Sequence, residues 1–233
     1  MAKIEDLLDA ALSSRLAPPG REWLARARDE LARGVADERF GALISAASRC
    51  ARREELAPTD VERRRAADLC EGLEIERWNL LETLRVRLVL ARSDLAQPST
   101  VRALESAFQF ADEGELCALY RSLALLPEPA RFRWRAGEGC RSNMRSVFDA
   151  AACDTPYPTR WFDELAFNQC VLKAVFIGVP LDRIWGLERR RNPELERMAQ
   201  DFADERRSAG RPVPADLARL TGARDGSRVA GDR

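Results

Sequence analysis

The sequence predicts an all-α fold of stacked antiparallel helical hairpins, arranged as irregular HEAT-like repeats or as a bundle. First, apolar residues recur every three or four positions along most of the 233 residues, which is the period of an amphipathic helix. Second, no stretch combines strict apolar–polar alternation with the β-branched enrichment of a strand. Third, turns containing glycine or proline divide the chain into segments of roughly 12–18 residues, a length suited to helices that pack as antiparallel neighbours.

In the first half of the chain, local signals set the predicted helix ends. Pro18-Pro19-Gly20 stops the first helix, and Gly34 ends the second. Thr59 or Asp60 is expected to cap one helix and Ser99 another, because their side chains accept hydrogen bonds from N–H groups of the first helical turn. The predicted helices cover residues 4–16, 23–34, 40–50, 59–72, 75–91 and 99–110, and the most apolar of them, 75–91, is interrupted by Arg85 and Arg87.

In the second half, Asn192 is a strong helix start, because Pro193 follows in the first turn and Glu194 lies near the positive end of the helix dipole. One domain is predicted over residues 1–210, with its motif-bearing core at 115–210. Residues 211–233 are polar and contain glycine and proline, so they are expected to form a largely disordered tail. The predicted helices cover residues 116–126, 141–152, 161–177 and about 193–209, with a short element at 181–187.

The segment 161–177 is apolar nearly all round when it is unrolled at about 100° per residue, which is typical of a fully buried helix. Asn168 falls in the middle of an apolar face, and Glu164 lies one turn before it. A buried amide needs hydrogen-bond partners. Either Asn168 bonds a neighbouring backbone group or Glu164 and fixes the register of the core, or Asn168, Glu164 and Lys173 line a ligand-binding cavity.

The preceding predicted helix, 141–152, supports either interpretation. Asn143 lies at the edge of its apolar stripe, and Arg141 projects from the opposite side. Lys173 stands out because Lys3 is the only other lysine in the chain. The candidate ligand-binding residues are therefore Asn143, Glu164, Asn168, Lys173 and Arg141.

Composition excludes several classes of function. Lys+Arg and Asp+Glu both number 38, so no net charge attracts nucleic acid or an anionic membrane. The chain has no histidine, which removes Ser-His-Asp and Cys-His catalysis and the most common metal ligand. No cofactor motif, metal motif or catalytic motif is present, and no cofactor is expected.

The six cysteines form no C-x-x-C pair and occupy positions typical of helix cores, so we expect reduced thiols in a cytoplasmic protein. The charged residues around Lys3 contain no apolar signal segment. No apolar run approaches the roughly 20 residues of a membrane span, so no membrane insertion is expected.

An ordered series of short motifs resembles the EboA family over roughly 115–211. The resemblance implies a role in making or exporting a secondary metabolite, beside enzymes of the same pathway, and it implies no reaction and no catalytic residues for this component. Phe167 stands where the family pattern has tryptophan. The motifs are Gly139-Cys140-Arg141-Ser142-Asn143-Met144, Tyr157-Pro158, Phe162 to Gln169, Val171 to Ala174, Pro180-Leu181, Arg183-Ile184, Gly186-Leu187, and Asn192-Pro193-Glu194-Leu195 running to Glu205-Arg206.

Three functional hypotheses follow. The first is a non-catalytic binding or scaffold protein that holds a small-molecule intermediate or a pathway enzyme. The second is an enzyme in which Glu164 or Asp163 serves as general acid or base and Lys173 as an electrostatic or amine group; helix phase places Lys173 about half a turn from Glu164. The third is metal binding by Asp149, Asp163 and Glu164, for which three or more oxygens must converge.

Overall fold

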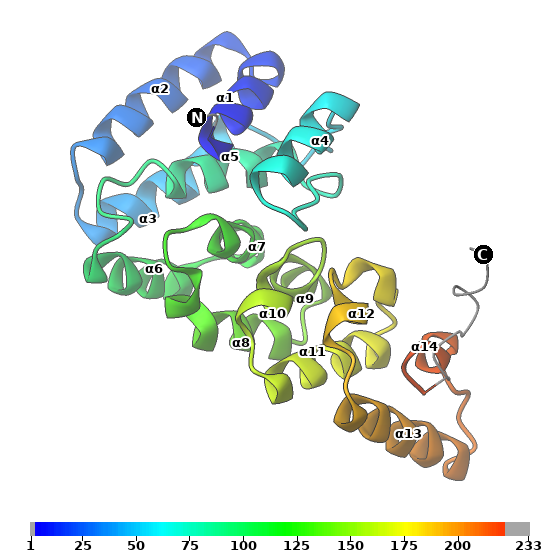
Figure 1. Ribbon diagram of the computed structural model, residues 1–233. Helices are drawn as coiled ribbons and strands as arrows, with labels where there is room; N and C mark the ends of the chain where they lie inside the picture. Colours follow the sequence, from blue (N-terminus) through cyan, green and yellow to red (C-terminus); the bar gives the residue numbers. More distant parts are fainter. Residues whose placement is uncertain (1–2, 222–233) are drawn as a thin grey trace, which may run out of the picture.

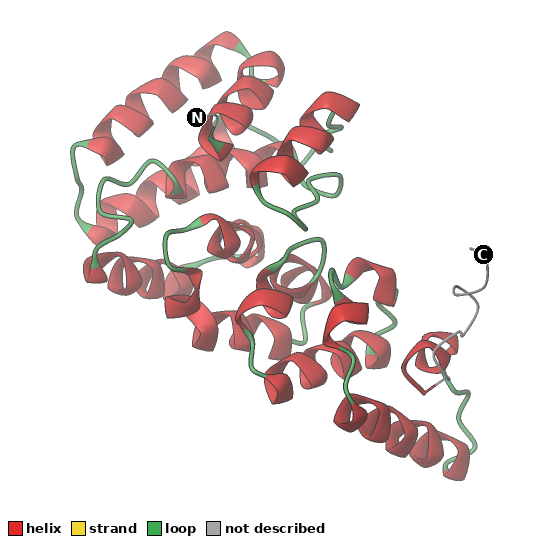
Figure 2. Ribbon diagram, in the orientation of Figure 1, coloured by secondary structure: helices red, strands yellow, loops and turns green. Residues whose placement is uncertain are grey.

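The computed structural model describes residues 3–221, and within this range the chain forms α-helices and short 3-10 turns and no strand (Figures 1 and 2). The prediction of an all-α fold is confirmed. The helices are α1 Ile4–Arg15, α2 Pro18–Ala32, α3 Asp37–Ala46, α4 Asp60–Leu69, α5 Leu80–Val89, α6 Pro98–Phe110, α7 Glu113–Ser122, α8 Arg133–Arg141, α9 Arg145–Ala152, α10 Tyr157–Trp161, α11 Glu164–Phe176, α12 Leu187–Arg190, α13 Pro193–Ser208 and α14 Ala218–Thr221.

The helices pack in two rows that run diagonally across Figure 1. One row joins α1, α5, α7 and α9 by direct contacts. The other contains α3, α6, α8, α11 and α13, in which Arg135 of α8 binds Glu105 of α6. Contacts of α7 with α6 and of α9 with α8 connect the rows. Two rows are compatible with stacked hairpins, and the finer prediction of HEAT-like repeats stays a prediction.

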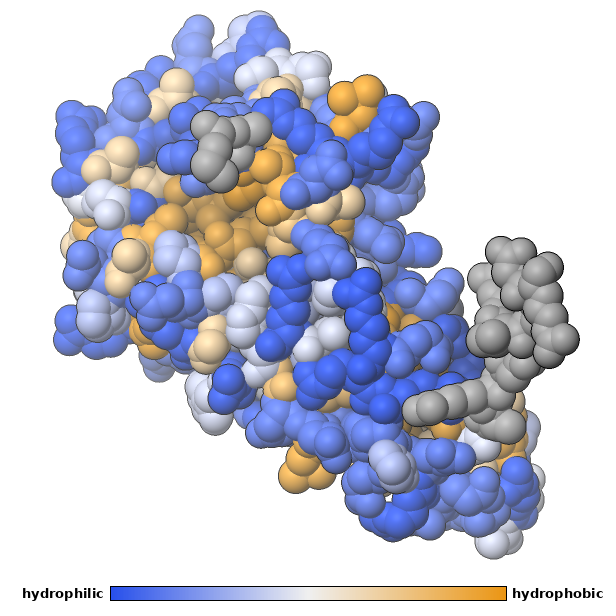
Figure 3. All heavy atoms as spheres, in the orientation of Figure 1, coloured by the Kyte–Doolittle hydropathy of each residue, from blue (hydrophilic) through white to orange (hydrophobic). Residues whose placement is uncertain are grey.

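The core includes buried residues from both rows. One connected set of buried apolar residues extends from Leu7 to Leu220. All ten residues of α5 are buried, including two arginines, so α5 is the fully buried helix of this fold. Figure 3 shows apolar side chains gathered in a hollow between the amino-terminal helices and α6 and α7. The domain boundary predicted at residue 210 stays a prediction.

Side-chain caps explain the starts of α4, α5, α7, α11 and α13. Thr59 forms a capping box with Glu62, and Asn192 caps α13, as predicted. The segment 75–91 becomes a helix only at Leu80, because Asn79 is an extended N-cap that forms a capping box with Glu82. The expected cap at Ser99 is wrong, since Gln97 is the N-cap and Pro98 occupies the first turn.

Three further predictions about helices need correction. The segment 141–152 is divided, because α8 ends at Arg141 and α9 begins at Arg145. The segment 161–177 is likewise divided at Phe162, and Leu165 and Phe176 of α11 are 58% and 63% exposed, so this helix is not buried all round.

The segment 211–221 is not disordered, because the 3-10 turn Ala215–Leu217 and α14 bury Leu217 and Leu220. The burial of these two apolar side chains orders a segment that is otherwise polar. The rest of the predicted tail, 222–233, lies outside the described residues.

The ion pair between Arg15 and Glu62 joins α1 to α4 and makes the stability of the fold depend on pH. Nη1 and Nη2 of Arg15 donate to the two carboxylate oxygens of Glu62 at 2.8 and 2.7 Å. This hydrogen bonding lowers the pKa of Glu62 from its ordinary 4.5 to about 2. The carboxylate therefore stabilises the folded state above the unfolded pKa, and this contribution is lost as pH falls from about 4.5 to about 2.

We expect Glu62→Gln to lower the free energy of unfolding at neutral pH by at most about 3 kcal/mol, and the difference from wild type to disappear near pH 2. Urea denaturation followed by circular dichroism across this range measures the difference. A difference that stays constant with pH would contradict the assignment.

Candidate functional site

Asn168 is fully buried and pairs with a second asparagine from another helix. Its Nδ2 donates to Oδ1 of Asn192 at 3.1 Å, and Nδ2 of Asn192 donates to Oδ1 of Asn168 at 2.9 Å. Asn192 also accepts from the N–H of Leu195 and donates to the carbonyl of Arg190. The pair attaches the start of α13 to the middle of α11. Asn168 therefore has a structural role in the core, and its partner is Asn192 and not Glu164.

Replacing Asn168 by leucine should therefore cost stability and leave ligand binding intact. We expect the free energy of unfolding to fall by about 1–2 kcal/mol, because Asn192 loses a buried partner for each of its amide groups. Equilibrium denaturation of Asn168→Leu beside Asn143→Leu, an exposed control, measures this. Equal stability of the two variants would contradict the structural role.

Glu164 and Asp163 lie at the exposed start of α11. Oδ1 of Asp163 accepts the N–H of Ala166 at 2.8 Å, so this carboxylate is the N-cap of the helix. Neither residue lines the groove described below, so the geometry does not join them to Lys173 at one site. A catalytic role for these groups stays a prediction.

Asp149, the remaining carboxylate of the metal hypothesis, binds Nε of Arg145 and Nη1 of Arg183, both at 2.8 Å. Within residues 3–221 no group of three or more Cys, Asp or Glu side chains is arranged to hold a metal ion. Asp149 therefore serves as an ion-pair partner for two arginines.

Three of the predicted residues come together between α8 and α11. Nζ of Lys173 donates to Oδ1 of Asn143 at 3.5 Å, in the link between α8 and α9. Arg141 and Lys173 both line a groove of about 150 Å³, while Asn168 and Glu164 lie outside it. All but Gly137 and Cys170 of the lining residues belong to the motifs that resemble the EboA family. The groove is lined by Gly137, Cys140, Arg141, Phe162, Ala166, Gln169, Cys170 and Lys173.

Two buried thiols and a phenyl ring give the groove an apolar wall. The sulfur atoms of Cys140 and Cys170 are 3.6 Å apart and buried, and Phe162 is buried beside the groove. The hydrogen bond to Cys140, together with burial, raises the pKa of Cys170 well above its ordinary value, so this thiol stays uncharged. All six cysteines are free.

The polar side of the groove carries two cations. The guanidinium of Arg141 is 60% exposed and pairs with Glu138, an exposed ion pair that contributes little energy. The ammonium of Lys173 also lies 5.7 Å from the ring centre of Phe176. An apolar wall with cations at one side suits a molecule that has an aromatic or aliphatic part and a polar or anionic end.

A second set of polar residues, which the sequence interpretation missed, lies inside the first row of helices. Arg85 of α5 faces Glu115 of α7 at 3.4 Å, and Nε of Arg121 lies 3.2 Å from Glu82. The arginines inside the apolar segment 75–91 could have indicated these ion pairs, because a buried guanidinium needs acidic partners. The positions of those partners depend on helix packing, which the sequence does not display.

Another hollow, of about 270 Å³, lies between α3 and α6. Its wall includes Ile44 and Ala107, and Asp37 and Glu38 supply acidic groups. Phe110, at the end of α6, also lines it and is 79% exposed.

None of the helices between residues 3 and 221 combines the length and the apolar character that crossing a bilayer requires.

Comparison with known proteins extends the resemblance to nearly the whole chain. A family model described as "Metabolite traffic protein EboA" matches residues 4–222, which includes the first hundred residues, where no motif was recognised. Searches of curated proteins and of solved structures gave no match. The match covers both rows of helices and the groove between α8 and α11. The chain therefore belongs to the EboA family, whose model describes metabolite traffic proteins.

Proposed function

We propose that this protein is a non-catalytic binding component of a secondary-metabolite pathway, and that it holds a small-molecule intermediate in the groove between α8 and α11. One observation carries the proposal. Six of the eight residues that line the groove come from three separate motifs of the EboA resemblance, and folding brings them to one place. The family description as metabolite traffic proteins supports the same function.

The shape and charge of the groove narrow the class of ligand. A cavity of about 150 Å³ is the size that holds a benzene ring in an engineered protein core. Cys140, Cys170 and Phe162 contact such a ring without requiring hydrogen bonds from it. Arg141 and Lys173 meet a carboxylate or phenolate at the mouth. The ligand is therefore an aromatic or short aliphatic compound with one anionic or strongly polar group.

A binding role and a catalytic role are distinguished by whether the folded protein converts the small molecule that it binds. The protein is purified gently from cells that carry its neighbouring pathway genes, and the small molecules it releases on denaturation are identified by mass spectrometry. We expect one compound near one equivalent per chain, and we expect the folded protein to leave that compound unchanged on incubation. Conversion by the wild type, lost in Glu164→Gln and Lys173→Ala, would instead support the enzyme hypothesis.

A further inference from the structure

Three helices begin at one cavity in the first row. The cavity has a volume of about 200 Å³ and shares no residue with the groove between α8 and α11. Leu81 in the first turn of α5, Gly114 in that of α7 and Ser146 in that of α9 all line it. First-turn N–H groups have no partner inside their own helix, and each helix start carries partial positive charge. Asn79 and Asp112 already accept the N–H groups of Glu82 and Glu115, so only the uncapped first-turn N–H groups are available near the cavity.

A buried arginine with a free donor also lines this cavity. Arg85 is 2% exposed, its Nε donates to the carbonyl of Ile44 at 3.1 Å, and its Nη2 lies 3.4 Å from Oε1 of Glu115. Nη1 is buried and has no hydrogen-bond partner among the described residues. Burial lowers the pKa of Arg85 despite the attraction of Glu115, so the pair does not fully replace the lost hydration. A buried guanidinium with a free N–H is a donor for an anion.

A second arginine lies across the start of α7. A Cβ added to Gly114 would come within 2.7 Å of Nη2 of Arg53, so glycine is what allows this guanidinium to approach the helix start. The guanidinium of Arg53 is 60% exposed and is 3.9 Å from the nearest oxygen of Asp112, a weak pair. Arg53 is therefore free to turn toward a bound anion from the open side of the cavity.

The two carboxylates that line the cavity are already engaged. Glu82 accepts from the N–H of Asn79 at 3.2 Å and faces Arg121. Glu113 accepts from the hydroxyl of Ser146. These acids therefore do not occupy Nη1 of Arg85.

We propose that this cavity binds an oxyanion, the carboxylate or phosphate group of a small molecule, between Arg85 on the inside and Arg53 at the mouth. First-turn N–H groups of α5, α7 and α9 that are not already capped supply further donors. Leu81 and Cys117 form an apolar wall, which leaves room for a small organic group beside the anion. The proposal is independent of the groove between α8 and α11, because the two sites share no residue.

Titration calorimetry of the full chain with two probes tests the proposal and identifies the source of the anion. Benzoate represents a carboxylate and inorganic phosphate a phosphate group. We expect one of them to bind with a dissociation constant of about 1 mM or tighter. Arg53→Gln should weaken binding about tenfold, the loss of one charge-assisted hydrogen bond. Gly114→Ala should weaken it similarly, because its methyl group displaces Arg53.

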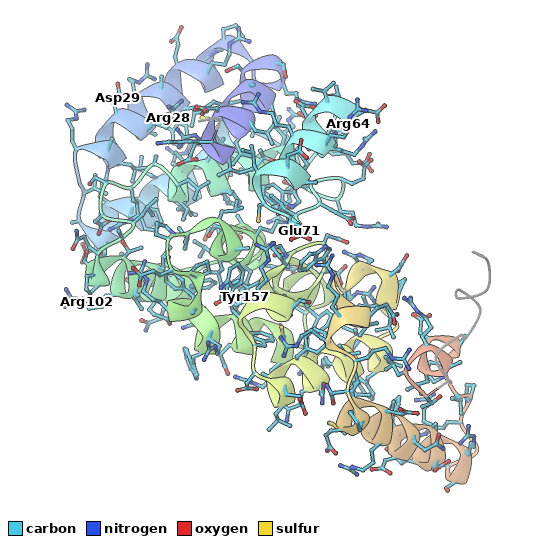
Figure 4. All side chains as sticks on the ribbon, viewed as in Figure 1. Arg28, Asp29, Arg64, Glu71, Arg102 and Tyr157 are labelled. Carbon is cyan, nitrogen blue, oxygen red and sulfur yellow. The ribbon has the colours of Figure 1, made fainter. Side chains whose placement is uncertain are left out.

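The matched control is Arg64→Gln, which removes an exposed arginine on α4, far from this cavity, where Figure 4 shows it at the edge of the molecule. This variant should bind the probe as the wild type does. A variant at Arg85 risks unfolding the core, so Arg85 is observed in the wild type by NMR of guanidinium groups labelled with ¹⁵N. We expect a slowly exchanging guanidinium signal to shift over the concentration range of the calorimetric titration.

Two results would overturn the proposal. One is no binding of either probe up to about 10 mM by folded protein. The other is binding that is equal in Arg53→Gln, Gly114→Ala and Arg64→Gln, with no slowly exchanging guanidinium signal affected, which would indicate surface ion binding only. Neither result bears on the groove between α8 and α11, so the proposed function is judged separately.

Discussion

Arg183→Leu is expected to lower the free energy of unfolding by about 3 kcal/mol. Arg183 lies in the 3-10 turn Leu181–Arg183, and its Nη2 donates to Oδ2 of Asp154 at 2.5 Å, while its Nη1 donates to Oδ2 of Asp149 at 2.8 Å. Asp154 is 4% exposed. Leucine would fill much of the space but leave Asp154 as a buried charge whose other cation, Arg77, is 3.9 Å away and exposed.

The pKa of Arg183 agrees with a strong pair. Burial alone would lower it, but the hydrogen bonds to Asp154 and Asp149 outweigh burial and raise it. Arg145→Leu is the matched control, because Arg145 binds the same Asp149 at 2.8 Å from the surface. Exposed pairs contribute roughly 0–1 kcal/mol. Urea denaturation measures the free energy of unfolding of both variants. Equal losses would show that burial of the pair between Arg183 and Asp154 is not what stabilises this part of the fold.

Gly139→Ala is expected to lower the free energy of unfolding by about 2 kcal/mol, although alanine is the better helix former. Gly139 lies inside α8, where a Cβ would come within 2.6 Å of Cβ of Ala151 and of Cε1 of Tyr120. Both neighbours are buried, and the ring of Tyr120 packs on that of Phe108 at 4.8 Å. Accommodating the methyl group therefore moves α8 away from α9.

Gly137→Ala in the same helix provides the control with the opposite sign. Its Cβ would meet only the end of the Arg141 side chain, at 3.4 Å, which is free to move. We expect this variant to be more stable by about 0.5–1 kcal/mol, because alanine replaces an unpacked helical glycine. Thermal or urea denaturation of the two variants gives the signs directly. Destabilisation of both, or of neither, would contradict the close approach of α8 and α9 at Gly139.

The helix starts that were predicted from the sequence are those with a local capping signal. Thr59 and Asn192 are caps whose partners lie three residues away, so their signal is complete within one turn of helix. Ser99 failed as a cap because Pro98 is better suited to the first turn, which moves the helix start upstream. The burial of individual residues was harder to predict. An apolar residue such as Leu165 or Phe176 does not itself reveal whether another helix covers it.

The candidate site was predicted in part for the same reason. Arg141 and Lys173, two of the predicted residues, both line the groove although they come from different helices, and their role in binding stays a prediction. Asn168 was selected for its buried amide, but its partner Asn192 is 24 residues further along the chain and becomes its neighbour only through packing. Arg85 could be recognised in the sequence as a charge in an apolar segment. The cavity beside it could not be predicted, because it forms from three helices that meet only through packing.

The most direct test of the binding role is native mass spectrometry of the chain purified from cells that carry its neighbouring genes. We expect one discrete added mass on the wild type and on Arg64→Ala. We expect the double variant Arg141→Ala/Lys173→Ala to lose that mass, while circular dichroism shows that each protein is folded. An added mass that the double variant retains would place the ligand elsewhere, and a bare chain in every sample would contradict a small-molecule binding function.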